Sequence, residues 1–572
     1  MLMNLAGATS EPRPMRRTLA ALLASVVLLV TACSPAPSAT PGSTTPGGTA
    51  GPGATTVPTT AARVDTLTVA VDNLGSQIYA PWLSGQENRI VVGLIGDTLT
   101  EINKQTNEVE PGLAESWTIS DDLKTWTIKM RGDVPFQGGY GNVTADDVKF
   151  SFEQWLNEES VHGVIGEQVL RSIDGDIANF EIVSPTEFRL HTESPVVSLP
   201  HILSDAAQSI TIQSKKYFEA EPVQALVKPL GSGPYEFVSN TPGVEVVLKA
   251  IASHPFRGVP ASDNLIIKEI PDSAARLAQV QSGGIDVALL DPGLAGEATA
   301  ASLSIVTTKD VESCGITLGG YYPGTTALDS DAPWVQSSDP AKGKAIREAM
   351  SLAIDRVTIL DRLIAGYGVL TYGPVLNYPN NPALHDSAWA PPPFDVALAK
   401  QKLAEGGFPN GFPITLRLWE QVPAGEAITD MWKEIGIDVT LEMTEQALMR
   451  PLFQASNQPE GNSDTDGLAW IFCSSRQPSP EMALPNAWMK TGRNMQAFNP
   501  AIDVAYEAMN AEGDEAARFK LARDLVTTLR EDVHPINLYT VDYPFVLGSR
   551  VATWAPVPGL NAFAAAETIA LK

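Results

Sequence analysis

The sequence predicts an α/β protein, in which strands and helices alternate along the chain. Apolar and polar residues alternate at 67–72 and 125–131, as in strands that bury one face. Apolar residues recur at three- and four-residue spacing within 144–156 and 345–366, as in helices that bury one face. The chain of 572 residues is also long enough for several domains, at ~150 residues each.

Residues 1–32 have the composition of a signal peptide. Arg16 and Arg17 precede the apolar run Leu19–Val30, which is shorter than the ~20 residues that span a bilayer. The sequence VTAC, which ends at Cys33, resembles the bacterial lipobox, in which a signal peptidase cuts before a cysteine that carries a diacylglycerol. We therefore expect a lipid on Cys33, which becomes the mature N-terminus. The alternative is an ordinary secretory leader that contains a cysteine.

Residues 33–63 are expected to be a disordered, lipid-anchored linker. The stretch 34–62 is rich in Pro, Gly, Ser and Thr and contains no charged or aromatic residue. Such a segment cannot bury enough apolar surface to offset the entropy of folding. We expect the folded body to be held at the extracytoplasmic face of the cell membrane.

The charge of the chain argues against two classes of partner. The net charge is −27, and residues 1–32 contribute three arginines and one glutamate, so the remainder carries about −29. A body this acidic repels nucleic acid and anionic lipid surfaces. We expect no nucleic-acid partner, and no second segment is apolar enough to span a membrane.

Individual elements can be placed from local signals. The stretch 180–192 is typical of a hairpin that turns at Ser184-Pro185. A capping-box sequence at Thr144–Asp147 predicts the start of a helix. Its expected apolar side is Val148, Phe152, Trp155 and Leu156. A second helical stripe, which we expect to continue to Gly366, consists of Ile346, Met350, Ile354, Val357 and Leu360.

The sequence contains no familiar catalytic motif. The six histidines are scattered without ligand spacing, so we expect no metal site. P-loop, dinucleotide-binding and nucleophile-elbow patterns are missing, and the glycines of GSGPY at 231–235 are more typical of a tight turn, with Tyr235 packed behind it. The acidic pairs Asp121-Asp122 and Asp146-Asp147 are typical of solvated or capping carboxylates. We expect no cofactor and no enzymatic activity; an enzyme of an unrecognised kind remains a third hypothesis.

Several motifs in one order resemble a known family. The segment at 113–155 is similar to the N-terminal signature of the peptide/nickel class of bacterial ABC-transporter solute-binding proteins, family 5, and the chain resembles the lipoprotein form. The similarity extends over nearly the whole mature chain. The further matching segments are GSGPYEF (231–237), RLAQVQSGGIDVALL (276–290), IREAMSLAIDR (346–356), FDVALAKQKLAEGGFPNGF (394–412), WKEIGIDVTLE (432–442) and NMQAFNPAIDVAYEAM (494–509).

The resemblance implies a two-lobed periplasmic-binding-protein-like fold of class II, the large peptide-binding type, with an extra subdomain and a hinge. The implied segments are 64–95 with 228–315 and 537–572 for the base lobe, 96–227 for the extra subdomain, and 316–536 for the second lobe. The implied function is capture of an oligopeptide by hinge closure and delivery to an ABC permease and its ATPase, by a monomer. Alternatives are a non-peptide solute (a glycan, a metal chelate or a modified peptide) or a cell-envelope regulator that transports nothing.

The resemblance also implies a set of ligand-binding residues: Asn73, Leu74, Tyr321, Trp470, Phe472, Cys473 and Arg476. Peptide-binding relatives hold the free α-amine of the ligand with an aspartate three residues after a tryptophan. In this sequence Cys473 stands three residues after Trp470, so the expected anchor is missing. Asp464, Asp466 and Glu481 could substitute, and each is equally typical of a solvated loop charge.

Three of these assignments have a structural alternative. Trp470 is expected in an aromatic wall of the pocket, but it could be a core tryptophan. Arg476 could bind an anionic group of the ligand or pair with a surface carboxylate. Relatives with a disulfide near the cleft imply a Cys314–Cys473 bond, which an oxidising exterior favours, whereas two buried free thiols are the alternative.

Overall fold

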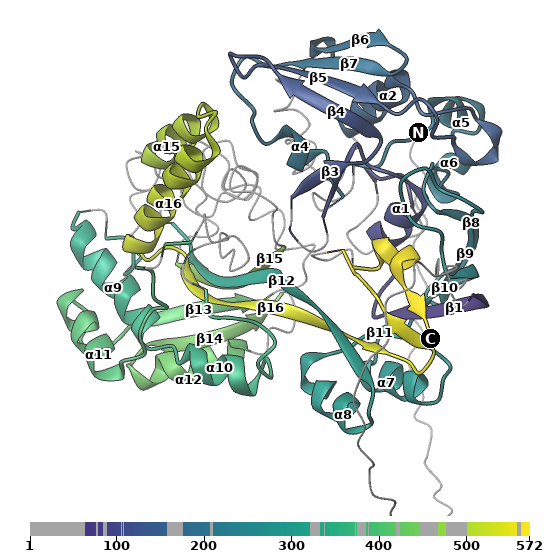
Figure 1. Cartoon of the computed structure of the whole chain (residues 1–572). Helices are drawn as coiled ribbons and strands as arrows, with labels where there is room; N and C mark the ends of the chain where they lie inside the picture. Colours follow the sequence, from purple (N-terminus) through teal and green to yellow (C-terminus); the bar gives the residue numbers. More distant parts are fainter. Residues whose placement is uncertain are drawn as a thin grey trace, which may run out of the picture. The chain divides into compact units, whose positions relative to one another are not determined.

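Residues from Thr60 to the C-terminus form one compact unit. Within it the computed structural model describes residues 63–75, 78–83, 88–103, 106, 108–156, 176–205, 210–320, 332–336, 338–371, 373, 385–386, 388–418, 424–444, 467–475, 500–557 and 562–572. Strands and helices alternate in this part of the chain, so the α/β prediction is confirmed (Figure 1).

The largest sheet of the described residues has ten strands. In spatial order they are β14 (Asp438–Met443), β13 (Pro413–Leu418), β15 (Leu468–Ser475), β12 (Ser304–Leu318), β16 (Ile536–Leu547), β11 (Val287–Leu289), β1 (Val64–Val71), β10 (Ser262–Glu269), β9 (Glu245–Ala250) and β8 (Tyr235–Thr241). Parallel and antiparallel pairs are mixed, since β1 runs parallel to β10 and β11 whereas β12 runs antiparallel to β15 and β16.

The half of the sheet that contains β1 is covered on both faces. Leu67, Val69 and Val71 of β1 join a core with α1 (Arg89–Ile95) and the 3₁₀ segment η6 (Ala562–Thr568). Ala70 joins a second core with α7 (Ser273–Gln281) and α8 (Ala295–Ala300). The strand's apolar residues therefore alternate between two helical layers, as expected for a strand buried on both sides.

The β15 end of the sheet has a core of its own. It includes Ile414 and Leu416 of β13 and Ala469 and Ile471 of β15. The helices that pack into it are α9 (Pro340–Leu352), α10 (Arg356–Arg362), α11 (Val396–Glu405), α12 (Ala424–Glu434), α15 (Pro500–Asn510) and α16 (Glu515–Glu531). The two long antiparallel strands β12 and β16 connect the two ends of the sheet (Figure 1).

A separate four-stranded sheet has the order β4 (Ala114–Ile119), β5 (Thr125–Met130), β7 (Glu187–His191) and β6 (Phe180–Ser184). Its core includes Trp126, Phe180 and Phe188. The antiparallel β6–β7 pair confirms the predicted hairpin. The capping box is also confirmed, because the Thr144 backbone N–H donates to Asp147 at 3.0 Å at the start of α2 (Ala145–Trp155).

The remaining elements are short, and four of them form two separate two-stranded sheets. They are β2 (Thr100–Ile102), β3 (Val109–Pro111), β17 (Val551–Thr553), β18 (Ala570–Leu571), α4 (Leu199–Ile202), α5 (Lys215–Ala220), α6 (Gln224–Val227), η1 (Gln137–Gly139), η2 (Ile177–Asn179) and η3 (Pro292–Leu294). None of the helices in the described ranges is both long and apolar enough to cross a bilayer. The lobe and subdomain boundaries given above stay predictions.

The prediction of one continuous helix up to Gly366 is wrong. The chain forms α9 and α10, because the Asp355 carboxylate accepts the Thr358 N–H at 3.0 Å and caps a new helix. The new start shifts the helical phase, so Val357 is 55% exposed and Ile359 is buried instead.

The GSGPY turn lies against the end of α1. A Cβ on Gly231 would stand 2.3 Å from the Ile95 carbonyl oxygen, and one on Gly233 would stand 2.7 Å from that of Leu94. Only glycine permits this approach. The Tyr235 ring is fully buried behind the turn, as predicted.

Candidate ligand-binding site

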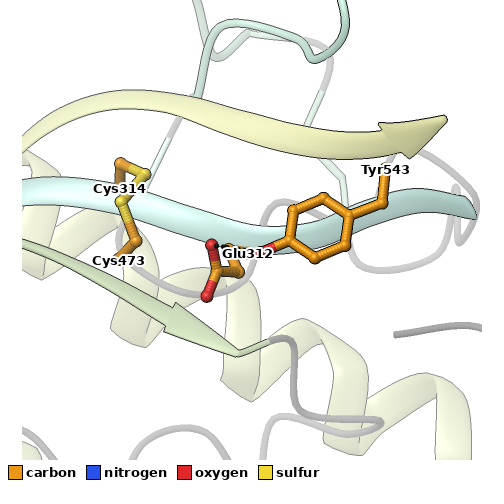
Figure 2. Close-up of a disulfide and its surroundings, with 4 residues drawn as sticks. All are labelled: Glu312, Cys314, Cys473 and Tyr543. Carbon is orange, nitrogen blue, oxygen red and sulfur yellow. Dashed lines mark hydrogen bonds between the residues drawn. A yellow bond between two sulfur atoms is a disulfide. The ribbon is translucent and has the colours of Figure 1, made fainter. Parts of the chain in front are cut away.

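Cys314 and Cys473 lie directly opposite each other on the neighbouring strands β12 and β15. Their sulfur atoms are 2.05 Å apart and form a disulfide between positions 159 residues apart in the sequence (Figure 2). The bond therefore joins the long strand β12 to β15, at the end of the sheet where the helices α9 to α12, α15 and α16 pack.

Alternation along β15 divides the predicted site residues between two faces. Ala469, Ile471 and Cys473 contact the core described above. Trp470 and Phe472 point to the opposite face, where both are 3% exposed. The structure thus brings Trp470 and Phe472 together, but it places the Cys473 side chain on the other face and bonds it to Cys314, which corrects its assignment to the same wall.

Strand register places further side chains beside Trp470. Thr317 of β12 and Arg417 of β13 are its two cross-strand neighbours, and Arg417 in turn lies opposite Glu442 of β14. The Arg417 guanidinium donates to the Glu442 carboxylate at 2.9 Å. The row combines a hydroxyl, an indole and an ion pair on one face. Sequence reasoning missed it because register between distant strands cannot be inferred from local patterns.

Phe472 lies over a glycine of the neighbouring strand. A Cβ on Gly315, its cross-strand neighbour, would stand 3.8 Å from the Phe472 ring and 3.3 Å from the Ile536 carbonyl oxygen. A side chain at this position would therefore press on the β16 backbone. The absence of a side chain at Gly315 lets the aromatic ring pack close to the paired long strands.

Among the described residues, the far half of β15 is paired on one side only, and we call its other side the free edge. β13 pairs with β15 only from Leu468 to Trp470. Residues Ile471–Ser475 continue the strand and, within the described part of the chain, pair with β12 alone. Their other edge presents backbone N–H and C=O groups that an extended chain can pair with.

A carboxylate lies on β12, on the other side of β15 from this free edge. Glu312 is opposite Ser475, the last residue of β15, and is two residues from Cys314. Its side chain is half-buried and accepts the Tyr543 hydroxyl at 3.1 Å (Figure 2). Burial, with a smaller effect from the Glu312 charge, raises the pKa of the nearby Tyr539 hydroxyl. The disulfide and Glu312 therefore lie on one face of β12, at the end of β15.

The loop after β1 contains two more predicted residues. Asn73 is exposed, and its side chain accepts the Gly75 N–H at 2.7 Å in a local turn. Leu74 packs in the core that β1 forms with α1 and η6, its N–H donates to Glu269 at 3.1 Å, and its carbonyl accepts from Asn88 at 3.1 Å. The Leu74 side chain is thus committed to the core, and Asn73 is the accessible member of this pair.

The other predicted site residues lie outside the described ranges. They are Cys33, Tyr321 and Arg476, together with the candidate amine partners Asp464, Asp466 and Glu481.

The chain matches the model of the bacterial extracellular solute-binding proteins, family 5 (Middle), over residues 108–492. The chain belongs to this family. It is 24% identical to heme-binding protein A of Haemophilus influenzae over 59% of this chain and 62% of that one. It is 27% identical to the glutathione-binding protein GsiB of Salmonella choleraesuis over 54% of this chain and 55% of that one. The matched stretch therefore spans little more than half the length of these curated relatives.

The fold is also found in solved structures of this kind. The periplasmic binding protein DppA of Helicobacter pylori, solved with the peptide STSA, superposes with a TM-score of 0.71 at 19% identity. The superposition covers 89% of this chain and 98% of that one. It confirms the predicted two-lobed periplasmic-binding-protein-like fold class of this family 5 member.

Proposed function

We propose that this family 5 protein captures oligopeptides outside the cytoplasm and delivers them to the permease and ATPase of an ABC importer. The observation that carries the proposal is the free edge of Ile471–Ser475. A peptide added there as a further strand gains backbone hydrogen bonds that do not depend on its sequence. Successive side chains of the bound peptide would point alternately to the face of the sheet that carries Phe472 and to the face that carries Glu312. The peptide bound to DppA of H. pylori supports this choice of ligand class.

Closure of two lobes over the ligand would give the permease a signal to recognise. A ligand that contacts both lobes shifts the equilibrium toward the closed state by its differential affinity for that state. β12 and β16 are the strands that join the two ends of the large sheet, so we propose that they form the hinge. We further propose that a lipid on Cys33 holds the protein, a monomer and not an enzyme, at the membrane surface.

We also propose Glu312 as the group that holds the α-amine of the peptide. The position where relatives carry an aspartate is Cys473 here, and Glu312 is the carboxylate nearest to that disulfide along β12. A half-buried carboxylate pairs more strongly with an ammonium group than an exposed one does.

Replacing Glu312 with glutamine tests this role. Retention of a random tetrapeptide library by E312Q is expected to fall about tenfold or more for peptides with a free amine, because a charged hydrogen bond contributes roughly 1.5–3 kcal/mol. Retention of the same library after N-acetylation should not change between the two proteins. Mass spectrometry of the retained peptides measures both. The exposed Glu507 of α15 provides the control, E507Q. An equal loss for both libraries assigns Glu312 to the fold instead.

Trp470→Ala tests the aromatic wall. If the indole contacts the ligand, peptide affinity should fall about 10- to 100-fold, in the range of an interface hot spot, with a small change in melting temperature. The matched control is Trp432→Ala, which removes an indole that packs in the core and donates to the Met350 carbonyl. That variant should lose stability first. Equal losses of affinity and melting temperature in Trp470→Ala favour the core interpretation.

The relatives keep two alternatives open. Their names record heme and glutathione as ligands, so a non-peptide or modified-peptide solute is the second candidate for this cleft. A regulatory lipoprotein that transports nothing is the third. Cells that lack the chain should lose uptake of a labelled peptide if it serves an importer, and unchanged uptake supports the regulator.

A further inference from the structure

The ladder between the long strands β12 and β16 has a bulge near its middle. Pairing stops after Thr308 and resumes at Glu312, and the three β12 residues between them, 309–311, lie opposite Asp542 alone. Asp310 has a φ of 51°, in the left-handed region, which aspartate tolerates better than most residues. A bulge leaves its extra residues out of the ladder and bends its strand. The pairing of β12 with β16 is therefore locally interrupted here.

The bulge coincides with a change of hydrophobic core on both strands. On β16, apolar residues up to Val541 pack in the core of helices α9 to α12, α15 and α16, whereas Phe545 and Leu547 pack in the core of α1 and η6. On β12 the same change falls between Val306 and Cys314. The ladder has a second irregularity directly after Cys314, but the strands pack in the same core on both sides of it. Of these two irregularities, only the bulge separates the two packed halves of the sheet.

A buried carboxylate holds the bulge. Asp542 is 2% exposed, its Oδ1 accepts the Asp310 N–H at 2.9 Å, and its Oδ2 accepts from Nζ of Lys309 at 2.5 Å. The Asp310 carboxylate accepts the Thr540 hydroxyl at 3.0 Å, and the oxygen of this hydroxyl accepts the Val369 N–H at 3.1 Å. Side-chain hydrogen bonds therefore connect the two strands where the ladder is interrupted.

A third segment, 367–371, runs along the other edge of β16 at the same point. The Asp542 N–H donates to the Tyr367 carbonyl at 3.0 Å, and the Thr540 N–H donates to the Val369 carbonyl at 2.8 Å. The Tyr367 side chain packs against two cores, the one that contains α9 and the one that contains α7 and α8. Tyr367 therefore lies where the two halves meet, beside Asp542.

A hinge between two packed bodies needs a few residues whose backbone torsions can change while the cores on either side stay packed. The bulge provides such residues, and Asp542 restrains them through side-chain hydrogen bonds instead of the ladder. We propose that residues 309–311 are the pivot of lobe closure and that Asp542 sets how freely this pivot moves. The inference rests on the hinge proposed above, and it holds whichever solute the protein binds.

Distances between two spin labels in the ligand-free full chain test the pivot. Labels at the exposed Glu297 of α8 and Lys400 of α11 span the bulge, whereas labels at Lys400 and the exposed Lys433 of α12 lie on one side of it. The labels are attached to genetically encoded azido residues, which leaves the disulfide intact. We expect the distance distribution of the spanning pair to be broader than that of the pair on one side.

Asp542→Ala should broaden the spanning distribution further, because it removes both bonds that restrain the bulge, and it should leave the other distribution unchanged. Asp310→Gly, which keeps the left-handed conformation and frees its torsions, should have the same effect if D542A fails to fold. The control D524A, which removes an exposed carboxylate of α16, should change neither distribution. An unchanged spanning distribution in the folded variants overturns the proposal. No ligand is added, so this result is independent of whether the solute is a peptide, which the tetrapeptide library tests separately.

Discussion

Replacing Cys314 and Cys473 together by serine is expected to lower the free energy of unfolding by about 4–5 kcal/mol in the chain-entropy model. The two positions are 159 residues apart, so the bond closes a long loop in the unfolded chain. The pair also lies within the strand register of β12 and β15, so no other pairing competes with it in the native state. Denaturant unfolding of the double variant and the wild-type protein measures the difference.

Thiol alkylation provides the control for this prediction. Without reductant the folded and unfolded wild-type chain should leave both cysteines unlabelled, and with reductant both should be labelled. Labelling of both cysteines without reductant, or equal stability of the double variant and the wild type, contradicts the prediction. Two buried free thiols would then be the correct interpretation.

Acidification from pH 6.5 to pH 4 is expected to lower the free energy of unfolding by about 3 kcal/mol through His534 alone. Burial, with a smaller effect from Arg347, lowers the pKa of this histidine to about 4. Its Nε2 lies 3.1–3.2 Å from the backbone oxygen and nitrogen of Leu318, at the end of β12. Between pH 6.5 and 4 the histidine binds a proton in the unfolded chain but not in the folded chain. The free energy of unfolding therefore decreases as the pH is lowered.

His534→Gln isolates this contribution. The variant has no titrating group at this position, while every other group titrates as in the wild type. We expect the difference in free energy of unfolding between the two proteins to change by about 1 kcal/mol per pH unit on average between pH 6.5 and 4. A difference that is constant over this range contradicts the prediction.

Much of the fold could be predicted from local signals. The β6–β7 hairpin and the α2 capping box follow from turn and cap residues that act over three or four positions. The prediction of a continuous helix was wrong at Asp355, because an aspartate within a helical pattern can either face solvent or cap a new helix. The apolar pattern alone does not distinguish these two outcomes.

The site was less accessible to sequence reasoning. The family resemblance named Trp470 and Phe472, which the structure places on one face of β15. Glu312 and Arg417 were missed because they come from strands far away in the sequence. One signal in the sequence could have indicated Glu312. The expected Cys314–Cys473 pair sets the register of β12 against β15, and this register places Glu312, two residues before Cys314, at the end of β15.

Oligopeptide capture is the function that we propose for this chain. Native mass spectrometry of the purified full chain, before and after mild unfolding, tests it most directly by revealing what occupies the cleft. We expect a heterogeneous set of short peptides with free α-amines that dissociates on unfolding. A single non-peptide species, bound in place of peptides and released in the same way, would contradict it.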